Sequence, residues 1–207
     1  VEEMSDASGT LWLDVQKRDW SDALLGVTGL NRSHMPRLVE GSAPSGELKP
    51  EFAKRWGMSG KIVVAGGAGD NAAAACGIGA IRPGEGFASL GTSGVLFVSN
   101  EKFRPNTQGA VHAFCHAIPK PWHQMGVILS ATDSLNWLSS VTGKTQADLS
   151  GLAEKSFTGP GEEIFLPYLS GERTPHNNAA ARGSFVGLSH LSDPARLAQA
   201  VLDGVTF

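Results

Sequence analysis

The sequence predicts a mixed α/β fold with two domains, on three observations. Short apolar runs that contain β-branched residues alternate with stretches of helical pattern. Glycine supplies 26 of the 207 residues, about twice its usual share of ~7%, and it gathers where strands turn into helices. With 41% hydrophobic and 18% charged residues, the composition is that of a globular chain long enough to bury a core.

The first sixty residues are expected to hold two short helices, at 20–27 and 50–56. Pro50 suits the first turn of the second helix, because the proline φ angle matches a helix start and the missing N–H is not needed there. Residues 5–10 and 40–47 are polar or rich in Gly, Ser and Pro, and both segments are therefore predicted to be loops.

The organisation changes near residue 60, which predicts domains at 1–60 and 61–207. The run 62–65 is wholly apolar and mostly β-branched, as in a buried central strand, and an alanine-rich helix follows at 72–80. A last helix is expected from Pro194, with Asp193 as its N-cap. The remaining predicted strands are 87–90, 95–98, 111–118, 122–129, 164–168 and 184–188, and one more helix is predicted near 130–141.

Charge and cysteine content exclude several classes of partner and site. Lys and Arg total 17 against 20 Asp and Glu, with no long basic run, so a nucleic-acid partner is not expected. No stretch approaches the ~18 apolar residues of a membrane span. Cys76 and Cys115 cannot form a disulfide framework and no signal peptide is recognisable, which favours the cytoplasm.

The glycine-rich segment 66–71 permits three interpretations. Gly67-x-Gly69-x-x-Ala72 fits the dinucleotide-binding fingerprint and would make the chain an NAD-binding oxidoreductase domain. That fingerprint requires an acid at the end of the following strand, whereas the nearest acid, Glu85, precedes it. Asp70 could instead cap the alanine helix. As a third possibility, it could act as a general base.

The turn Gly91-Thr92-Ser93-Gly94 offers backbone N–H groups and two hydroxyls at one point, which is how proteins hold phosphate. Such residues also fill many hairpins that bind nothing. An acid at Asp70 followed some twenty residues later by a phosphate-type turn suits phosphoryl transfer, in which a carboxylate takes a hydroxyl proton while amides and Mg²⁺ hold the phosphates.

Taken together, the motifs resemble the FGGY family of carbohydrate kinases, and within it most closely the kinases of xylulose. The resemblance rests on Ser5-Asp6-Ala7-Ser8-Gly9-Thr10, Ala65-Gly66-Gly67 with Gly69-Asp70-Asn71-Ala72, Ser89-Leu90-Gly91-Thr92-Ser93-Gly94, and the run from Leu166 to His176. It implies an actin-like (ribonuclease H-like) ATPase fold of two domains, of which the chain would be an internal fragment. That fragment would cover the end of the first domain and the start of the second, and it should be inactive alone.

The resemblance also implies roles for particular residues. Asp70 would be the catalytic base and would contact the sugar together with Asn71. Gly91, Thr92 and Ser93 would approach the ATP phosphates, and Thr132 and Asn136 would lie near the ribose or adenine. The expected substrate-binding residues are thus Asp70 and Asn71. The expected nucleotide-binding residues are Gly91, Thr92, Ser93, Thr132 and Asn136.

The implied reaction is the MgATP-dependent phosphorylation of D-xylulose to D-xylulose 5-phosphate by a protein that could be a homodimer. Ribulose, glycerol and gluconate remain alternative substrates. The residues themselves also leave open a sugar-binding or interaction module without catalysis.

Three further features permit a functional and a structural interpretation. His112, His116 and His123 could converge on a metal, although packing roles are favoured because Cys115 alternates to the other face of the strand. The pair Glu172-Arg173 could touch substrate, although fixing a loop is favoured. Asp6 could face the sugar or could lie in a solvated loop.

Overall fold

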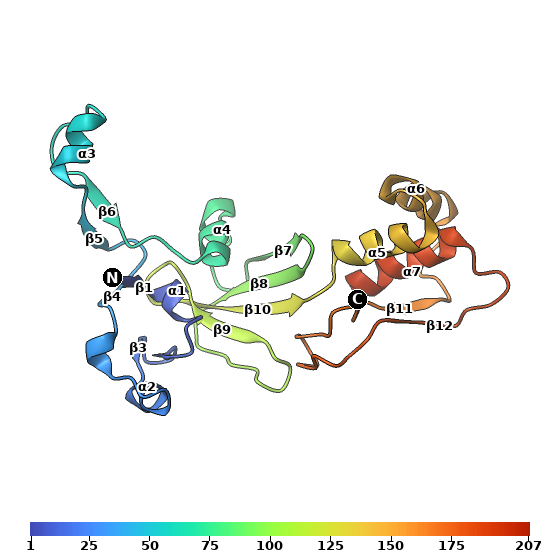
Figure 1. Ribbon diagram of the computed structural model, residues 1–207, viewed down its shortest axis with the longest axis horizontal. Coiled ribbons are helices and arrows are strands. Elements are labelled where there is room, and N and C mark those ends of the chain that lie inside the picture. The colour runs from blue at the N-terminus through green and yellow to red at the C-terminus, as the bar shows by residue number, and fades with distance from the viewer. The chain divides into compact units, whose positions relative to one another are not determined.

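All 207 residues are described by the computed structural model, and they form two compact units (Figure 1). The first unit comprises Val1–Phe87, Phe97–Asn106 and His112–Met125, and the second comprises Ala88–Leu96, Thr107–Val111 and Gly126–Phe207. None of the helices in either unit is both long and apolar enough to cross a membrane.

The N-terminal part of the first unit consists of short elements around a small core. These are β1 (Glu2–Glu3), α1 (Met4–Ala7), β2 (Leu13–Asp14), β3 (Asp19–Trp20), α2 (Asp22–Val27), the 3₁₀ helix η1 (Arg32–His34), β4 (Leu38–Val39), β5 (Pro44–Glu47), α3 (Pro50–Arg55), β6 (Val63–Ala65) and α4 (Asp70–Ile78). Strands β1 and β4 pair in parallel, while β2 pairs with β3 and β5 with β6 in antiparallel fashion. The core contains Met4, Ala7, Leu13, Trp20, Leu25 and Cys115.

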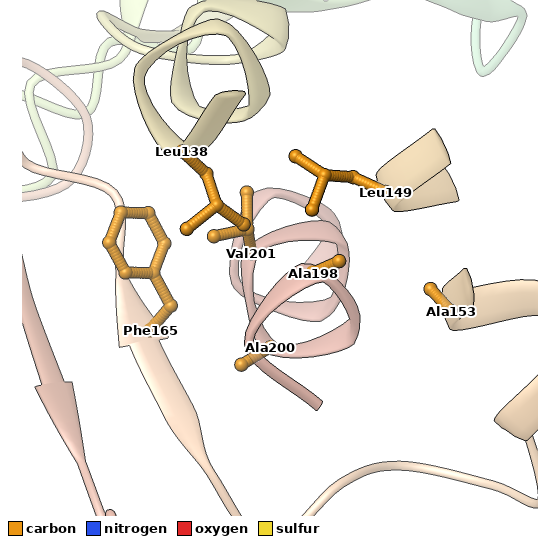
Figure 2. Close-up of a cluster of buried hydrophobic side chains, with 7 residues drawn as sticks. All are labelled: Leu138, Leu149, Ala153, Phe165, Ala198, Ala200 and Val201. Carbon is orange, nitrogen blue, oxygen red and sulfur yellow. The ribbon is translucent and has the colours of Figure 1, made fainter. Parts of the chain in front are cut away.

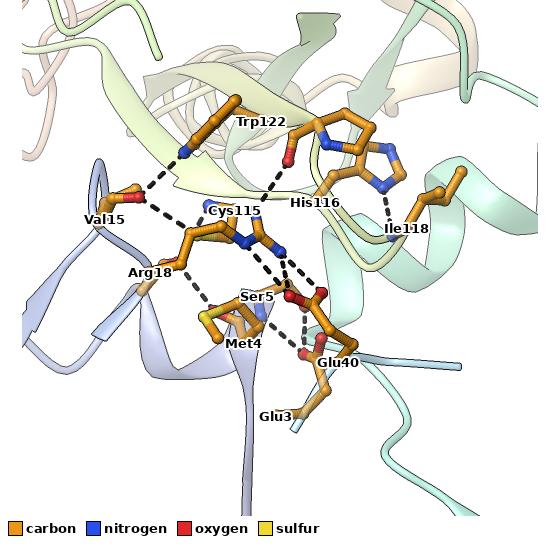
Figure 3. Close-up of polar contacts among 12 residues, drawn as sticks. Glu3, Met4, Ser5, Val15, Arg18, Glu40, Cys115, His116, Ile118 and Trp122 are labelled. Atoms are coloured by element: carbon orange, nitrogen blue, oxygen red, sulfur yellow. Dashed lines mark hydrogen bonds and ion pairs between the residues drawn. The ribbon is translucent and has the colours of Figure 1, made fainter. Parts of the chain in front are cut away.

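A bidentate ion pair ties three loops of this unit together (Figure 3). The Arg18 guanidinium donates to both carboxylate oxygens of Glu40, at 2.7 Å for the shortest contact, and to the carbonyl of Pro121 at 3.2 Å. It also lies over the ring of Trp122. Because Arg18 is mostly buried, the paired geometry satisfies a charge that would be costly to leave alone.

Three sequence-based expectations in this unit are wrong. Residues 5–10 do not form a loop throughout, because Glu3 caps the short helix α1. Residues 40–47 are not all loop, because β5 pairs with β6. The strand at 62–65 forms as β6, yet Val63 is 59% exposed. Its apolar pattern indicated a strand correctly, but in a two-stranded sheet no further layer covers it.

A four-stranded sheet follows, with the order β7–β8–β10–β9. Its strands are β7 (Gly86–Leu90), β8 (Gly94–Asn100), β9 (His112–Cys115) and β10 (Trp122–Ile128). Side chains along β10 alternate between buried and half-buried, as expected for a strand with one covered face. In the β9–β10 ladder, His123 stands opposite Phe114 and Trp122 opposite Cys115. All four predicted strands are confirmed, with wider bounds for β7 and β8 and narrower bounds for β9 and β10.

Three helices and a two-stranded antiparallel sheet form the core of the second unit. They are α5 (Thr132–Thr142), α6 (Gln146–Ser156), α7 (Pro194–Thr206), β11 (Ile164–Leu166) and β12 (Ser184–Val186). Figure 2 shows Leu138 of α5 and Leu149 of α6 directed at α7, with Phe165 of β11 closing the cluster. The predicted start of α7 is confirmed, because the Asp193 carboxylate accepts the N–H groups of Ala195 and Arg196.

Candidate functional site

The glycines before Asp70 allow the backbone to run close to a neighbouring segment. A Cβ on Gly66 would lie 2.5 Å from the carbonyl oxygen of Glu40. Gly67 has φ +93°, a backbone angle that residues with a side chain rarely adopt. The preceding strand β6 is antiparallel to β5. A dinucleotide fingerprint requires instead a parallel strand in a βαβ unit, so the NAD-binding interpretation is not supported.

Asp70 is the first residue of α4, and Gly69 holds the N-cap position. No side chain caps this helix, so the alternative in which Asp70 serves as its N-cap is not supported. The Asp70 Oδ1 atom accepts the backbone N–H of Asn71 at 2.6 Å and its side-chain Nδ2 at 3.0 Å. The other oxygen, Oδ2, has no hydrogen-bond partner. One carboxylate oxygen is therefore held in place while the other is available to accept a proton.

A cavity of about 90 Å³ lies beside this carboxylate, within the first unit. It is lined by Ser5, Asp6, Gly9, Gly69, Asp70, Asn71, Ala72, Phe114, His123 and Met125. The predicted sugar residues Asp70 and Asn71 thus share one cavity, and Asp6 of α1 joins them. The Asn71 amide and the carboxylates of Asp6 and Asp70, beside an aromatic and a thioether side chain, form a suitable lining for a polyol, which has both C–H and O–H surfaces.

The wall of this cavity contains a histidine held neutral by its surroundings. His123 is 2% exposed and stacks on the ring of Phe97 with centroids 4.3 Å apart. Burial, and after it the nearby His116, lowers the pKa of His123 to about 3. His116 is itself buried and meets His123 edge-on at 5.9 Å. These two rings therefore have a packing role in the aromatic cluster.

This burial predicts a pH-dependent stability. In the unfolded chain His123 takes up a proton below about pH 6.5, whereas in the folded chain it does so only near pH 3, so acidification favours unfolding across that window. At about 1.4 kcal/mol per pH unit, protonation of His123 in the unfolded chain should lower the free energy of unfolding by about 2 kcal/mol between pH 7 and pH 5. Denaturant unfolding at these two pH values should therefore show a smaller drop for His123→Phe than for wild type. His190→Gln, a change at an exposed histidine, is the control. An equal drop in the free energy of unfolding in all three proteins would contradict the assignment of the pH effect to His123.

The predicted phosphate turn lies in the second unit and is oriented by α5. The carbonyl of Gly91 accepts the N–H of Thr132 at 3.1 Å, and the carbonyl of Thr92 accepts the N–H of Ala131 at 2.8 Å. In a trans peptide the C=O and the following N–H point in opposite directions. The N–H groups of Thr92 and Ser93 are consequently directed away from α5, and neither has a hydrogen-bond partner. Two free amides in an exposed turn fit an anion.

The two predicted nucleotide residues on α5 differ in their contacts. The Thr132 hydroxyl donates to the Gly91 carbonyl at 2.7 Å, so this side chain fixes the turn. Asn136 is exposed one helical turn further along and accepts a hydrogen bond from Gln146 of α6 at 3.1 Å. The structure thus brings Thr132 together with Gly91–Ser93, while Asn136 lies on the same face of the helix.

Two features were missed or left open by the sequence. Glu172 is 2% exposed, and its Oε1 accepts the N–H groups of Leu129 and Arg173, which supports the loop-fixing interpretation of Glu172. Ser5 was missed as a contact of the loop that precedes Asp70, although its hydroxyl accepts the N–H of Gly69 at 3.0 Å. Only its place in the motif with Asp6 could have drawn attention to it.

Comparison with known proteins identifies the family. Residues 1–77 match the N-terminal domain and residues 86–207 the C-terminal domain of the FGGY family of carbohydrate kinases. The chain belongs to this family. The actin-like fold of FGGY kinases predicted from the motifs is thereby confirmed, with parts of both domains present.

Individual FGGY relatives are similar along nearly the whole chain. Xylulose kinase from Escherichia coli (strain K12) is 52% identical over 206 residues, and xylulose kinase from Lactococcus lactis is 40% identical over 207. The matches cover 99% of this chain but only 42% and 41% of those proteins. The chain thus spans less than half the length of the curated relatives.

Solved FGGY structures show the same pattern. A crystal structure of a "xyloylose kinase" from Brucella ovis is 54% identical with a TM-score of 0.95, covering 99% of this chain and 42% of that one. A gluconate kinase from Lactobacillus acidophilus is 26% identical with a TM-score of 0.89 and the same coverage.

Proposed function

We propose that this protein transfers the γ-phosphate of MgATP to D-xylulose, giving D-xylulose 5-phosphate and ADP. The observation that carries the proposal is the carboxylate of Asp70, which has one oxygen fixed by Asn71 and one free beside a polar cavity. The choice of sugar is supported by the relatives named xylulose kinase, at 52% and 40% identity.

In this reaction the terminal hydroxyl oxygen of D-xylulose attacks the γ-phosphorus, and the bond from that phosphorus to the bridging oxygen of ADP breaks. The hydroxyl proton passes to the free Oδ2 of Asp70. Asn71 keeps the carboxylate oriented and contacts the sugar. The Thr92 and Ser93 amides donate to phosphate oxygens, and Mg²⁺ bound with the nucleotide supplies further neutralisation of their charge. Thr132 and Asn136 lie toward the ribose or adenine.

The same proposal includes a cytoplasmic location, a homodimeric assembly, and no nucleic-acid or membrane partner. The charge balance supports the lack of a nucleic-acid partner, and the cysteine content supports the location. The homodimer is what the resemblance to the family implies. The gluconate kinase among the similar structures makes gluconate the second candidate substrate.

A substrate panel tests the proposed activity. ADP release by the full-length protein would be measured with D-xylulose, D-ribulose, glycerol and gluconate, and D-xylulose should give the highest kcat/KM. A higher kcat/KM with gluconate would make gluconate the substrate in place of D-xylulose. If none of the sugars caused ADP release, the proposal would be overturned. Thermal shifts with MgATP and with NAD should show stabilisation by MgATP only.

A hydroxyl deletion tests the phosphate turn. Thr92→Val keeps the shape of the side chain but removes its hydroxyl, which has no partner within the chain, so the melting temperature should stay nearly unchanged. The KM for ATP should rise or kcat should fall, because a phosphate contact is lost. Thr92→Ser retains the hydroxyl and should behave like wild type. Wild-type kinetics in Thr92→Val would show that the segment is only a turn.

A further inference from the structure

The backbone that leads into Asp70 is anchored at successive points, and the last anchor is a side chain. Gly66 donates its N–H to the carbonyl of Ala43 at 2.9 Å, and Gly67 donates to that of Gly41 at 3.1 Å. At Gly69, directly before Asp70, the acceptor is instead the hydroxyl of Ser5 at 3.0 Å. The residue that carries the base is therefore positioned by a side chain that lies 64 positions earlier in the sequence.

Ser5 is in turn oriented by Glu3, as Figure 3 shows. The Glu3 Oε2 atom accepts the Ser5 hydroxyl at 2.5 Å and the N–H groups of Ser5 and Asp6 at 2.9 and 3.1 Å. Because the hydroxyl proton is directed at Glu3, the oxygen lone pairs of Ser5 are left to face Gly69. Both side chains are buried, at 6% and 5% exposure, so their geometry is confined by packing.

Capping of α1 explains only part of this arrangement. It accounts for the contacts of Glu3 with the two backbone N–H groups, which satisfy the first turn of the helix. It does not require the side-chain contact from Glu3 to Ser5, nor the contact from Ser5 to Gly69. A buried carboxylate is costly to retain, and an apolar side chain could fill the same space.

We propose that Glu3 and Ser5 are positioning residues that hold Asp70 in its catalytic orientation through the N–H of Gly69. The inference rests on the proposed function, in which Asp70 is the base. Loss of the Ser5 hydroxyl frees the peptide next to Asp70 while Gly66 and Gly67 stay anchored. The carboxylate then samples more orientations, and misplacement by about 1 Å can cost about 10²-fold in rate.

The chain offers a matched control at the C-cap of the same helix, directly after its last residue. Ser8 is 4% exposed, donates its hydroxyl to the carbonyl of Met4 at 2.9 Å and accepts the N–H of Cys115 at 3.0 Å. It therefore makes the same two kinds of contact as Ser5, but toward β9 and not toward the Asp70 loop. Ser8→Ala measures what a buried hydroxyl contributes to stability alone.

The test compares Ser5→Ala and Ser5→Cys with Ser8→Ala in the full-length protein. Cysteine fills the space of the serine side chain, but its sulfur is only a weak hydrogen-bond acceptor. Ser5→Cys therefore tests the hydrogen bond even if the smaller alanine disturbs folding. We expect both Ser5 variants to lose about 10- to 100-fold in kcat with little change in the KM for ATP. Ser8→Ala should keep kcat within about threefold of wild type despite a similar fall in melting temperature. Equal kcat in the Ser5 and Ser8 variants would overturn the proposal.

Two further measurements separate positioning from general stability. Amide exchange in a peptide spanning 66–72 should accelerate in the Ser5 variants and not in Ser8→Ala. Adding Ser5→Ala to Asp70→Asn should lower kcat no further than Asp70→Asn does alone, because Ser5 acts through the base. Unchanged exchange or full additivity would refute the positioning role. By contrast, an active Asp70→Asn would refute the proposed base, and the exchange result would still stand on its own.

Discussion

Asp70→Asn should reduce kcat by about 10²- to 10⁴-fold, the usual contribution of a positioned general base. Asparagine can still accept the N–H of Asn71 through its side-chain oxygen, so the start of α4 should keep its geometry. It cannot take a proton from a sugar hydroxyl. The variant should therefore fold with a near-normal melting temperature and bind D-xylulose, and steady-state kinetics with a binding measurement will check this.

The control for this variant is Asp148→Asn. Asp148 lies in the first turn of α6, as Asp70 does in α4, and accepts a hydrogen bond from Thr145, but it does not line the cavity. Its kcat should stay close to wild type. If Asp70→Asn retained more than about a tenth of wild-type turnover, the loss would be smaller than a general base requires, and the mechanism would be refuted.

Phe165→Ala should destabilise the protein by about 3–5 kcal/mol, the range for removal of a large aromatic side chain from a core. Phe165 is 2% exposed, stacks against Trp137 with centroids 5.7 Å apart, and packs at a tilt against Phe185 with centroids 4.7 Å apart. The backbone of α7 also approaches closely here, since a Cβ on Gly204 would collide with the carbonyl of Phe165. Little relaxation can fill the resulting cavity.

Denaturant unfolding of the full-length protein measures this loss, with Phe157→Ala as the reference. Phe157 follows the last residue of α6 and is 60% exposed, so its removal should change the unfolding free energy by less than about 0.5 kcal/mol. Similar losses in the two variants would mean that Phe165 does not belong to the core.

Features set by local chemistry could be predicted from the sequence. The start of α7 was correct because the Asp193 carboxylate accepts N–H groups of the first turn and the φ angle of Pro194 suits a helix start. The turn at Gly91 was correct because it separates two β-rich runs. Helix α6 was missed, since it has a glycine at its centre and buries only Leu149 and Ala153. A pattern with so few buried positions is hard to distinguish from a polar connection.

What the sequence could not supply was the long-range partner of each segment. The apolar run of β6 indicated a strand but could not indicate what would cover it, so its burial was predicted wrongly. The helix-start pattern placed Asp70 near the beginning of α4 but could not place the cap at Gly69. The contact of Ser5 with Gly69 joins residues far apart in the chain, and no local spacing encodes it.

The way the Gly91–Ser93 turn is bonded to α5 has a mechanical consequence. Both carbonyls of the turn are fastened to the first residues of the helix, and the Thr132 side chain adds a third attachment. We therefore expect the amide donors of the turn and the side chains further along α5 to move together. In the proposed site, the turn would bind the phosphates of the nucleotide and the helix would contact its nucleoside. Both ends of the nucleotide would then be bound by one connected element. Any tilt of α5 would shift the phosphate contacts and the nucleoside contacts at once, so neither end of the nucleotide could be released independently.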